Sequence, residues 1–185
     1  AAMHICHDFE EMLSVYSAYG WLNNGFIVHG HSMGGFIAQR GLRKELETSS
    51  NLKGIILESP VTSYSLINNV TCEFLKIPSK LHPWMMKRLL RLYNSMNKPR
   101  YIIHDVEFLE SPKWGVPDAP KLLVQAMDDA TLGELHWKHL ADVHTKIDSN
   151  FTQHILENLK HSYERNNIER DHIIQDWIEK ESLFF

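Results

Sequence analysis

The sequence has 185 residues, of which 43% are hydrophobic and 23% charged, a globular balance that excludes disordered and collagen-like classes. Its 23 acidic and 19 basic residues give a net charge of −4, and no basic block could follow a phosphate backbone, so nucleic acid is not an expected partner. Two cysteines, no apolar run of roughly 18 residues and no signal-peptide pattern predict a reducing, cytoplasmic compartment and no membrane span.

The first segment of the chain has the spacing of an amphipathic helix that ends before a glycine. We expect this helix from Asp8 to about Tyr19, with Gly20 stopping it. The next apolar segment, Phe26–His29, predicts a strand packed beside that helix.

The most informative motif follows this strand and places a serine at the apex of a sharp strand-turn-helix connection. Ser32 stands in a G-x-S-x-G frame, which exposes a nucleophile above a sheet. We expect a side chain at Gly30 or Gly34 to collide with its surroundings, and Gly35 to allow close helix packing. The N–H group of Met33 is the expected oxyanion donor. An ordinary glycine-rich turn is the alternative, and the strand before it and the helix after it disfavour that interpretation.

The remaining elements alternate between strands and helices. The helix after the turn is expected to run to about Glu47. The other expected elements are strands at Gly54–Glu58, at Lys121–Ala126 and within Thr152–Leu159, and helices at about Leu132–Val143 and Glu169–Glu181. This alternation predicts an α/β fold with a parallel sheet covered on both faces.

At Gly30–Gly35 the sequence resembles the α/β-hydrolase superfamily, particularly its esterase, lipase and serine-aminopeptidase-like branches, which carry Gly-His-Ser-Met-Gly-Gly. The resemblance implies a mostly parallel α/β-hydrolase sheet. In that family several strands precede the nucleophile, whereas only residues 1–25 precede the first strand here. We therefore expect that the chain corresponds to the C-terminal part of the fold, that an N-terminal segment would complete the sheet, and that the second oxyanion donor is missing.

The connection from Glu58 to Lys121 is far longer than the dozen or so residues that a crossover needs. The resemblance implies a cap over the active site at this position. We expect residues 1–60 and 111–185 to form the core and residues 61–110 a small helical cap, in which Trp84, Met85 and Met86 line an apolar substrate site. Helices that belong to the main core are the alternative.

A serine nucleophile needs a base and usually an acid, and in this fold they follow the serine in the order acid, then histidine. Asp128 and Asp129 come directly after the Lys121–Ala126 strand. Alignment with the family's glycine, two residues, aspartate pattern, in which Ala126 takes the place of the glycine, favours Asp129 as the acid and Asp128 as its neighbour. A solvated acidic turn is the alternative.

The base is expected in the loop between the last strand and the last helix, where it can reach Ser32. His161 occupies such a loop, whereas His154 would lie on the strand and His172 within the helix. Lys160-His161-Ser162 also looks like the family's catalytic-histidine loop.

No cofactor and no metal site are expected. His136 and His139 share a helix face, and His4-x-Cys6-His7 is locally metal-like, but neither group has two further ligands at a suitable spacing. Exposed helical histidines are therefore the expectation.

The residues together predict a serine hydrolase that cleaves an acyl bond in a small-molecule substrate through Ser32, Asp129 and His161. A carboxylic ester is favoured because the expected cap residues are apolar; amide, peptide and thioester cleavage stay open. The rival from another class is a non-catalytic binding module, which the missing oxyanion donor supports. The intact order of the three residues argues against it.

Overall fold

A computed structural model describes residues 2–97, 102–111, 113, 115–147, 149–161 and 166–183. Its centre is a sheet in which four strands follow one another in chain order and every neighbouring pair is parallel. The strands are β1 (Phe26–His31), β2 (Leu52–Glu58), β3 (Lys121–Ala126) and β4 (Phe151–Leu156). The predicted parallel sheet is confirmed, and β3 has its predicted bounds.

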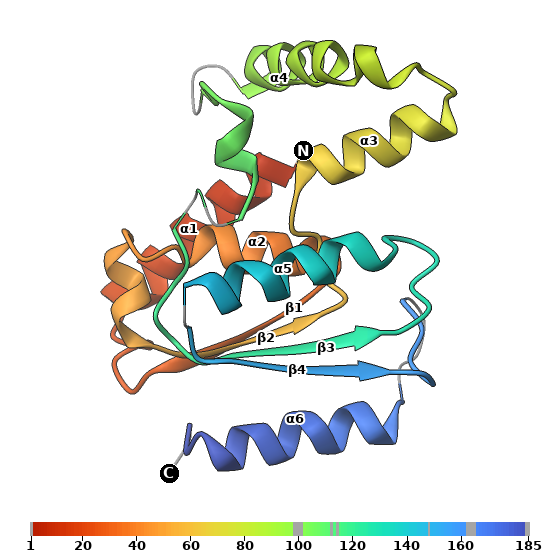
Figure 1. Cartoon of the computed structure of the whole chain (residues 1–185). Coiled ribbons are helices and arrows are strands. Elements are labelled where there is room, and N and C mark those ends of the chain that lie inside the picture. The colour runs from red at the N-terminus through yellow and green to blue at the C-terminus, as the bar shows by residue number, and fades with distance from the viewer. Residues whose placement is uncertain are drawn as a thin grey trace.

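Helices cover both faces of the sheet. α1 (Ala2–Ala18), α2 (Met33–Gly41) and α5 (Glu134–Lys146) lie on one face, and α6 (Ile168–Lys180) lies on the other (Figure 1). α1 begins earlier than predicted because its first turns bury Met3 and Cys6. The prediction that α2 continues to about Glu47 is wrong. Ser49 Oγ donates to the carbonyls of Leu42 and Arg43, at 3.2 and 2.9 Å, and so stabilises an earlier end.

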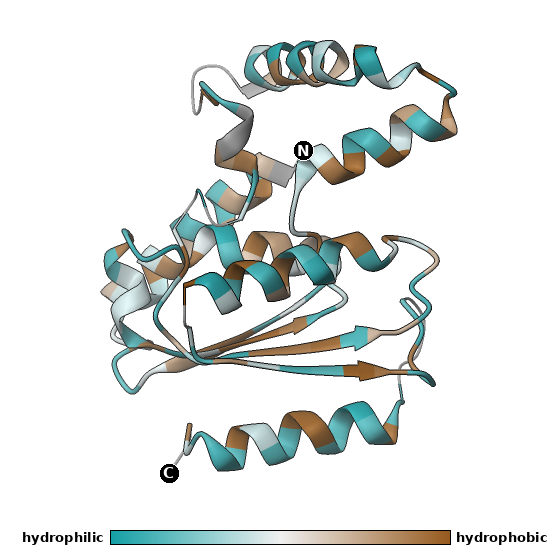
Figure 2. Cartoon of the chain, in the orientation of Figure 1, coloured by the Kyte–Doolittle hydropathy of each residue, from teal (hydrophilic) through white to brown (hydrophobic). Residues whose placement is uncertain are grey.

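The core consists of two apolar layers separated by the sheet. Alternate residues of β2 and β3 point to opposite faces, so both strands are buried almost throughout. The layer beneath α6 contains Ile56, Leu122, Val124, Ala126, Leu156 and Trp177; the opposite layer contains Leu13, Leu42, Ile55, Leu57, Leu123 and Leu140. Apolar residues run along the central strands, while α6 also carries hydrophilic residues (Figure 2).

β1 is less buried than the two central strands. Within the part of the chain that the structure describes, β1 pairs with β2 alone and forms one edge of the sheet. His29 and His31, near its end, are both exposed. The carboxyl end of this edge strand therefore presents two imidazoles beside the turn that carries Ser32.

The segment between β2 and β3 contains α3 (Tyr64–Phe74) and α4 (His82–Asn97), with short 3₁₀ turns at Ser79–Leu81 and Val106–Leu109. α3 and α4 lie beyond α1 and α2, on the side away from the sheet (Figure 1). Their contact with those helices is a third apolar cluster, which contains Met3, Cys6, Phe36, Val61, Met86, Ile103 and Leu109. Among the helices of the described ranges, none combines the length and apolar character needed to cross a bilayer.

Candidate active site

Ser32 stands at the turn between β1 and α2 in a backbone conformation that non-glycine residues rarely adopt. Its φ is 52°, and such conformations cost of order 1–3 kcal/mol unless the surroundings hold them. Ser32 N–H donates to the Glu58 carbonyl at 2.9 Å, and Ser32 C=O accepts from Gly35 and Val61 N–H at 3.0 Å. A serine before a helix usually accepts a hydrogen bond from that helix, but the Ser32 hydroxyl makes no such bond. Its hydroxyl is left for another partner.

Two of the three glycines in the turn are there for steric reasons. A Cβ at Gly30 would lie 2.5 Å from the Gly34 carbonyl oxygen, and one at Gly35 would lie 2.5 Å from Pro60 Cβ. The expected collision at Gly34 is wrong, because a Cβ there would meet nothing within 4 Å. Gly34 lies in the first turn of α2 and faces open space.

His161 is the partner of the Ser32 hydroxyl. Its Nε2 lies 3.0 Å from Ser32 Oγ, and its Nδ1 lies 2.7 Å from Asp129 Oδ2. The His161 and Asp129 side chains are both buried. The alternatives lie elsewhere: His154 on β4 and His172 on α6 are exposed. The structure thus brings together the three residues that the sequence selects, each from the carboxyl end of a different parallel strand.

Asp129 is held by more donors than the sequence suggests. Its Oδ1 accepts N–H groups from Thr131 and Leu132 at 2.9 Å, and its Oδ2 accepts from Gln125 Nε2 at 3.1 Å. Burial raises the pKa of this carboxyl, but the hydrogen bonds from Leu132, His161 and Thr131 and the attraction to the imidazole outweigh burial, so the pKa is lowered. Asp129 is therefore an anion at neutral pH, whereas Asp128 is exposed.

Sequence reasoning missed two polar contacts to this group. Gln125, on β3, supports Asp129, and His31 Nε2 donates to the backbone carbonyl of His161. The signal for Gln125 is a lone amide within the buried run of β3. For His31 the sequence indicated a packing residue with a satisfied ring nitrogen near the pocket, but it did not indicate that the partner is the His161 carbonyl.

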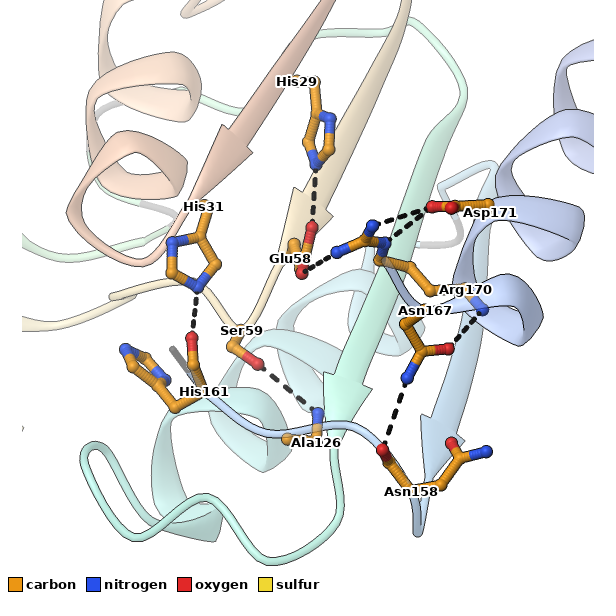
Figure 3. Close-up of polar contacts among 10 residues, drawn as sticks. All are labelled: His29, His31, Glu58, Ser59, Ala126, Asn158, His161, Asn167, Arg170 and Asp171. Atoms are coloured by element: carbon orange, nitrogen blue, oxygen red, sulfur yellow. Dashed lines mark hydrogen bonds and ion pairs between the residues drawn. The ribbon is translucent and has the colours of Figure 1, made fainter. Parts of the chain in front are cut away.

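The connection that carries His161 is tied to the sheet by a second polar group (Figure 3). The Glu58 carboxylate, at the end of β2, lies 3.2 Å from His29 Nε2 and 3.3 Å from Arg170 on α6. At the start of α6, Asn167 caps the helix by accepting the N–H of Arg170 and donates to the Asn158 carbonyl at 3.3 Å. Burial raises the pKa of Glu58, but the bond from His29 and the charge of Arg170 outweigh it, so the pKa is lowered.

The expected apolar wall is only partly assembled. Met86 is buried in the cluster beneath α4, against which Met33 packs, and Met85 is half-buried. Trp84 is 51% exposed and lies under the Arg88 guanidinium at 5.0 Å. The structure does not bring Trp84 into this cluster, because consecutive residues of a helix point about 100° apart.

His136 is a structural residue rather than an exposed one, so that expectation is wrong. It is buried, and Thr62 N–H donates to its Nδ1 at 3.1 Å. Burial lowers the pKa of His136 to about 4, so the ring is neutral near pH 7 and can accept this bond. His139 Nε2 donates to the Ser111 carbonyl at 2.9 Å. In the described ranges, no group of three or more His, Cys, Asp or Glu residues is arranged to hold a metal ion.

Comparisons with known proteins identify a family and a fold. The family model described as serine aminopeptidase, S33 matches residues 2–113. Among curated proteins, no sequence match is found.

Solved structures share the fold at low sequence identity. The carboxylesterase of Bacillus cereus is 16% identical with a TM-score of 0.53, and the match covers 97% of this chain and 61% of that enzyme. An inhibited esterase B from Lactobacillus rhamnosis is 16% identical with a TM-score of 0.63, covering 96% and 60%. The acylaminoacyl peptidase of Pyrococcus horikoshii is 17% identical with a TM-score of 0.57, covering 94% and 27%. These similarities show an α/β-hydrolase fold. The chain spans about three fifths of the length of the two esterases.

Proposed function

We infer the reaction from the family and the geometry: the chain belongs to the serine aminopeptidase S33 family, and we propose that it hydrolyses an acyl bond through a covalent acyl-serine intermediate. The observation that carries this proposal is the hydrogen-bonded chain from Ser32 through His161 to Asp129. A hydroxyl, an imidazole and a buried carboxylate in this order are what acyl transfer requires.

In the proposed mechanism Ser32 Oγ attacks the substrate carbonyl while His161 Nε2 accepts its proton. The lowered pKa of Asp129 keeps an anion 2.7 Å from Nδ1, where it fixes the tautomer and stabilises the imidazolium. His161 then donates the proton to the leaving group, and water activated by the same nitrogen releases the acyl group. The N–H of Met33, in the first turn of α2, is the proposed donor to the oxyanion, because the first amides of a helix lack intrahelical acceptors.

We propose a carboxylic ester with an apolar acyl chain as the substrate. Met33 follows the nucleophile directly, and Leu132 donates its N–H to Asp129. Both side chains pack against the apolar cluster beneath α3 and α4, together with Tyr64, whose hydroxyl lies 3.9 Å from Met33 Sδ. Residues 61–110 would thus act as a cap that supplies apolar walls. The family description and the peptidase neighbour favour amide cleavage as the second candidate.

Hydrolysis of p-nitrophenyl esters of increasing acyl length, alongside aminoacyl p-nitroanilides, tests this proposal. We expect ester turnover that Ser32→Ala abolishes. Ser182→Ala is the matched control, because Ser182 also has a positive φ, 51°, but lies after α6. Faster turnover of the anilides would replace the ester by an amide, and turnover that survives in Ser32→Ala would refute the serine mechanism.

A further inference from the structure

The residue before the nucleophile contacts the residue that acts as base. His31 Nε2 donates a hydrogen bond to the backbone carbonyl of His161, and the two imidazole rings lie 5.2 Å apart, tilted by 47° (Figure 3). This contact is separate from the two that the His161 ring makes with Ser32 and Asp129.

The backbone at His31 is held by the sheet. His31 is the last residue of β1, where it pairs with Glu58 of β2, and the next residue, Ser32, donates its N–H to the carbonyl of that same Glu58. One dipeptide fixed to the sheet therefore meets His161 twice, through Ser32 Oγ at the ring and through His31 Nε2 at the backbone. Any shift of the His161 backbone away from Ser32 would also break the bond to His31.

The connection between β4 and α6 has further contacts before and after His161. Leu159 is buried in the layer beneath α6, and Asn167 donates to the Asn158 carbonyl, so these contacts hold the two ends of the connection. Leu159 and Asn158 lie two and three residues before His161. The bond from His31 acts on His161 itself.

We propose that His31 is a positioning residue, which sets the distance between the nucleophile and the base through the His161 carbonyl. The inference rests on the proposed function, since it assigns a role within the same reaction. A carbonyl oxygen only accepts, so His31 must carry a proton on Nε2; in the neutral ring, Nδ1 is then an acceptor. A misplacement of about 1 Å can cost about 100-fold in rate, so loss of one restraint on His161 should lower kcat more than it changes KM.

The experiment compares side chains whose amide does or does not reach the position of Nε2. His31→Gln places an N–H donor at that depth, whereas the shorter His31→Asn does not. His154→Asn is the matched control, because His154 is also an exposed histidine of a strand, but it lies on β4 and belongs to neither of the polar groups around His161. Each variant is assayed for kcat and KM on p-nitrophenyl butyrate and for thermal unfolding.

We expect kcat to fall about tenfold in His31→Asn with KM within about twofold, to recover most of that loss in His31→Gln, and to stay near wild type in His154→Asn. A wild-type kcat in His31→Asn, or a His31→Gln variant no faster than His31→Asn, would overturn the inference. Failure of the proposed function gives a different result, since wild type and Ser32→Ala would then be equally active or equally inactive on the ester.

Discussion

Replacement of Asp129 by Asn changes one atom that faces two donors. The amide oxygen can still accept the N–H groups of Thr131 and Leu132, which lie 2.9 Å from Oδ1. The NH₂ group then stands in place of Oδ2, which now accepts from Gln125 Nε2 at 3.1 Å and from His161 Nδ1 at 2.7 Å. Gln125 can turn its own amide oxygen toward the new donor, but His161 can adapt only by losing the proton on Nδ1.

The altered tautomer of His161 determines the size of the effect. With Nδ1 as the acceptor, the ring proton moves to Nε2, which lies 3.0 Å from Ser32 Oγ, and an N–H group cannot accept the serine proton. An amide at this position of a triad lowers kcat by about 10⁴-fold, equivalent to about 5 kcal/mol of transition-state stabilisation. We expect that loss in Asp129→Asn with little change in fold, because the two backbone bonds to Oδ1 are kept.

Steady-state hydrolysis of p-nitrophenyl butyrate, with thermal unfolding measured in parallel, gives the comparison. Asp128→Asn is the control, since Asp128 is the exposed neighbour, and its kcat should stay near wild type. An Asp129→Asn variant within tenfold of wild type, or an Asp128→Asn variant with the larger loss, would refute the assignment of the acid.

Three further predictions concern the residues around the site. The pKa of His136 is lowered from 6.5 to about 4, so the folded state should lose stability as the pH falls from 6.5 toward 4, by at most about 3 kcal/mol. Urea unfolding of His136→Asn should show a smaller loss of stability over this pH range, and an equal loss would contradict the role of His136. The lowered pKa of Glu58 stabilises the folded state at pH values above 4.5, the ordinary pKa of a glutamate, and this contribution is lost as the pH falls through the folded pKa. Glu58→Gln should therefore reduce the pH dependence of unfolding below pH 4.5. An unchanged dependence would argue against the pair with Arg170. Gly30→Ala should destabilise the protein by about 1–3 kcal/mol, because its Cβ would lie 2.5 Å from a backbone atom. Gly34→Ala should not destabilise it, because a Cβ there meets nothing within 4 Å. Equal melting temperatures of the two variants would contradict this steric account.

The sequence predicted those parts of the structure that depend on local chemistry and chain order. The strand-turn-helix around Ser32 follows from glycine spacing. The rule that loops after parallel strands meet at one edge places both aspartates and His161 near Ser32, and the family resemblance favours Asp129 over Asp128 and supports His161. Tertiary contacts decided the rest. The end of α2 is stabilised by the Ser49 hydroxyl, which donates to the Leu42 carbonyl seven residues earlier in the chain. The burial of His136 depends on the Thr62 N–H, which comes from a distant loop.

The expected apolar wall of the substrate site also depends on tertiary contacts that the sequence does not reveal. The resemblance and the apolar residue types selected Trp84, Met85 and Met86, but the rotation of α4 decides which of these side chains faces inward. Only Met86 joins the buried cluster that α1 and α2 also line. His31 and Gln125 are a second case, because a polar residue in a variable position gains its role only when another strand or loop brings a partner to it.

The central claim is that Ser32 is a nucleophile activated by His161. Treatment with a fluorophosphonate probe, followed by intact-mass measurement and peptide mapping, tests it most directly, because the adduct marks the atom that attacks. We predict one adduct per chain, located on Ser32, no adduct in Ser32→Ala, and much slower labelling in His161→Gln. An adduct at any other residue, or equal labelling of Ser32→Ala, would contradict the account.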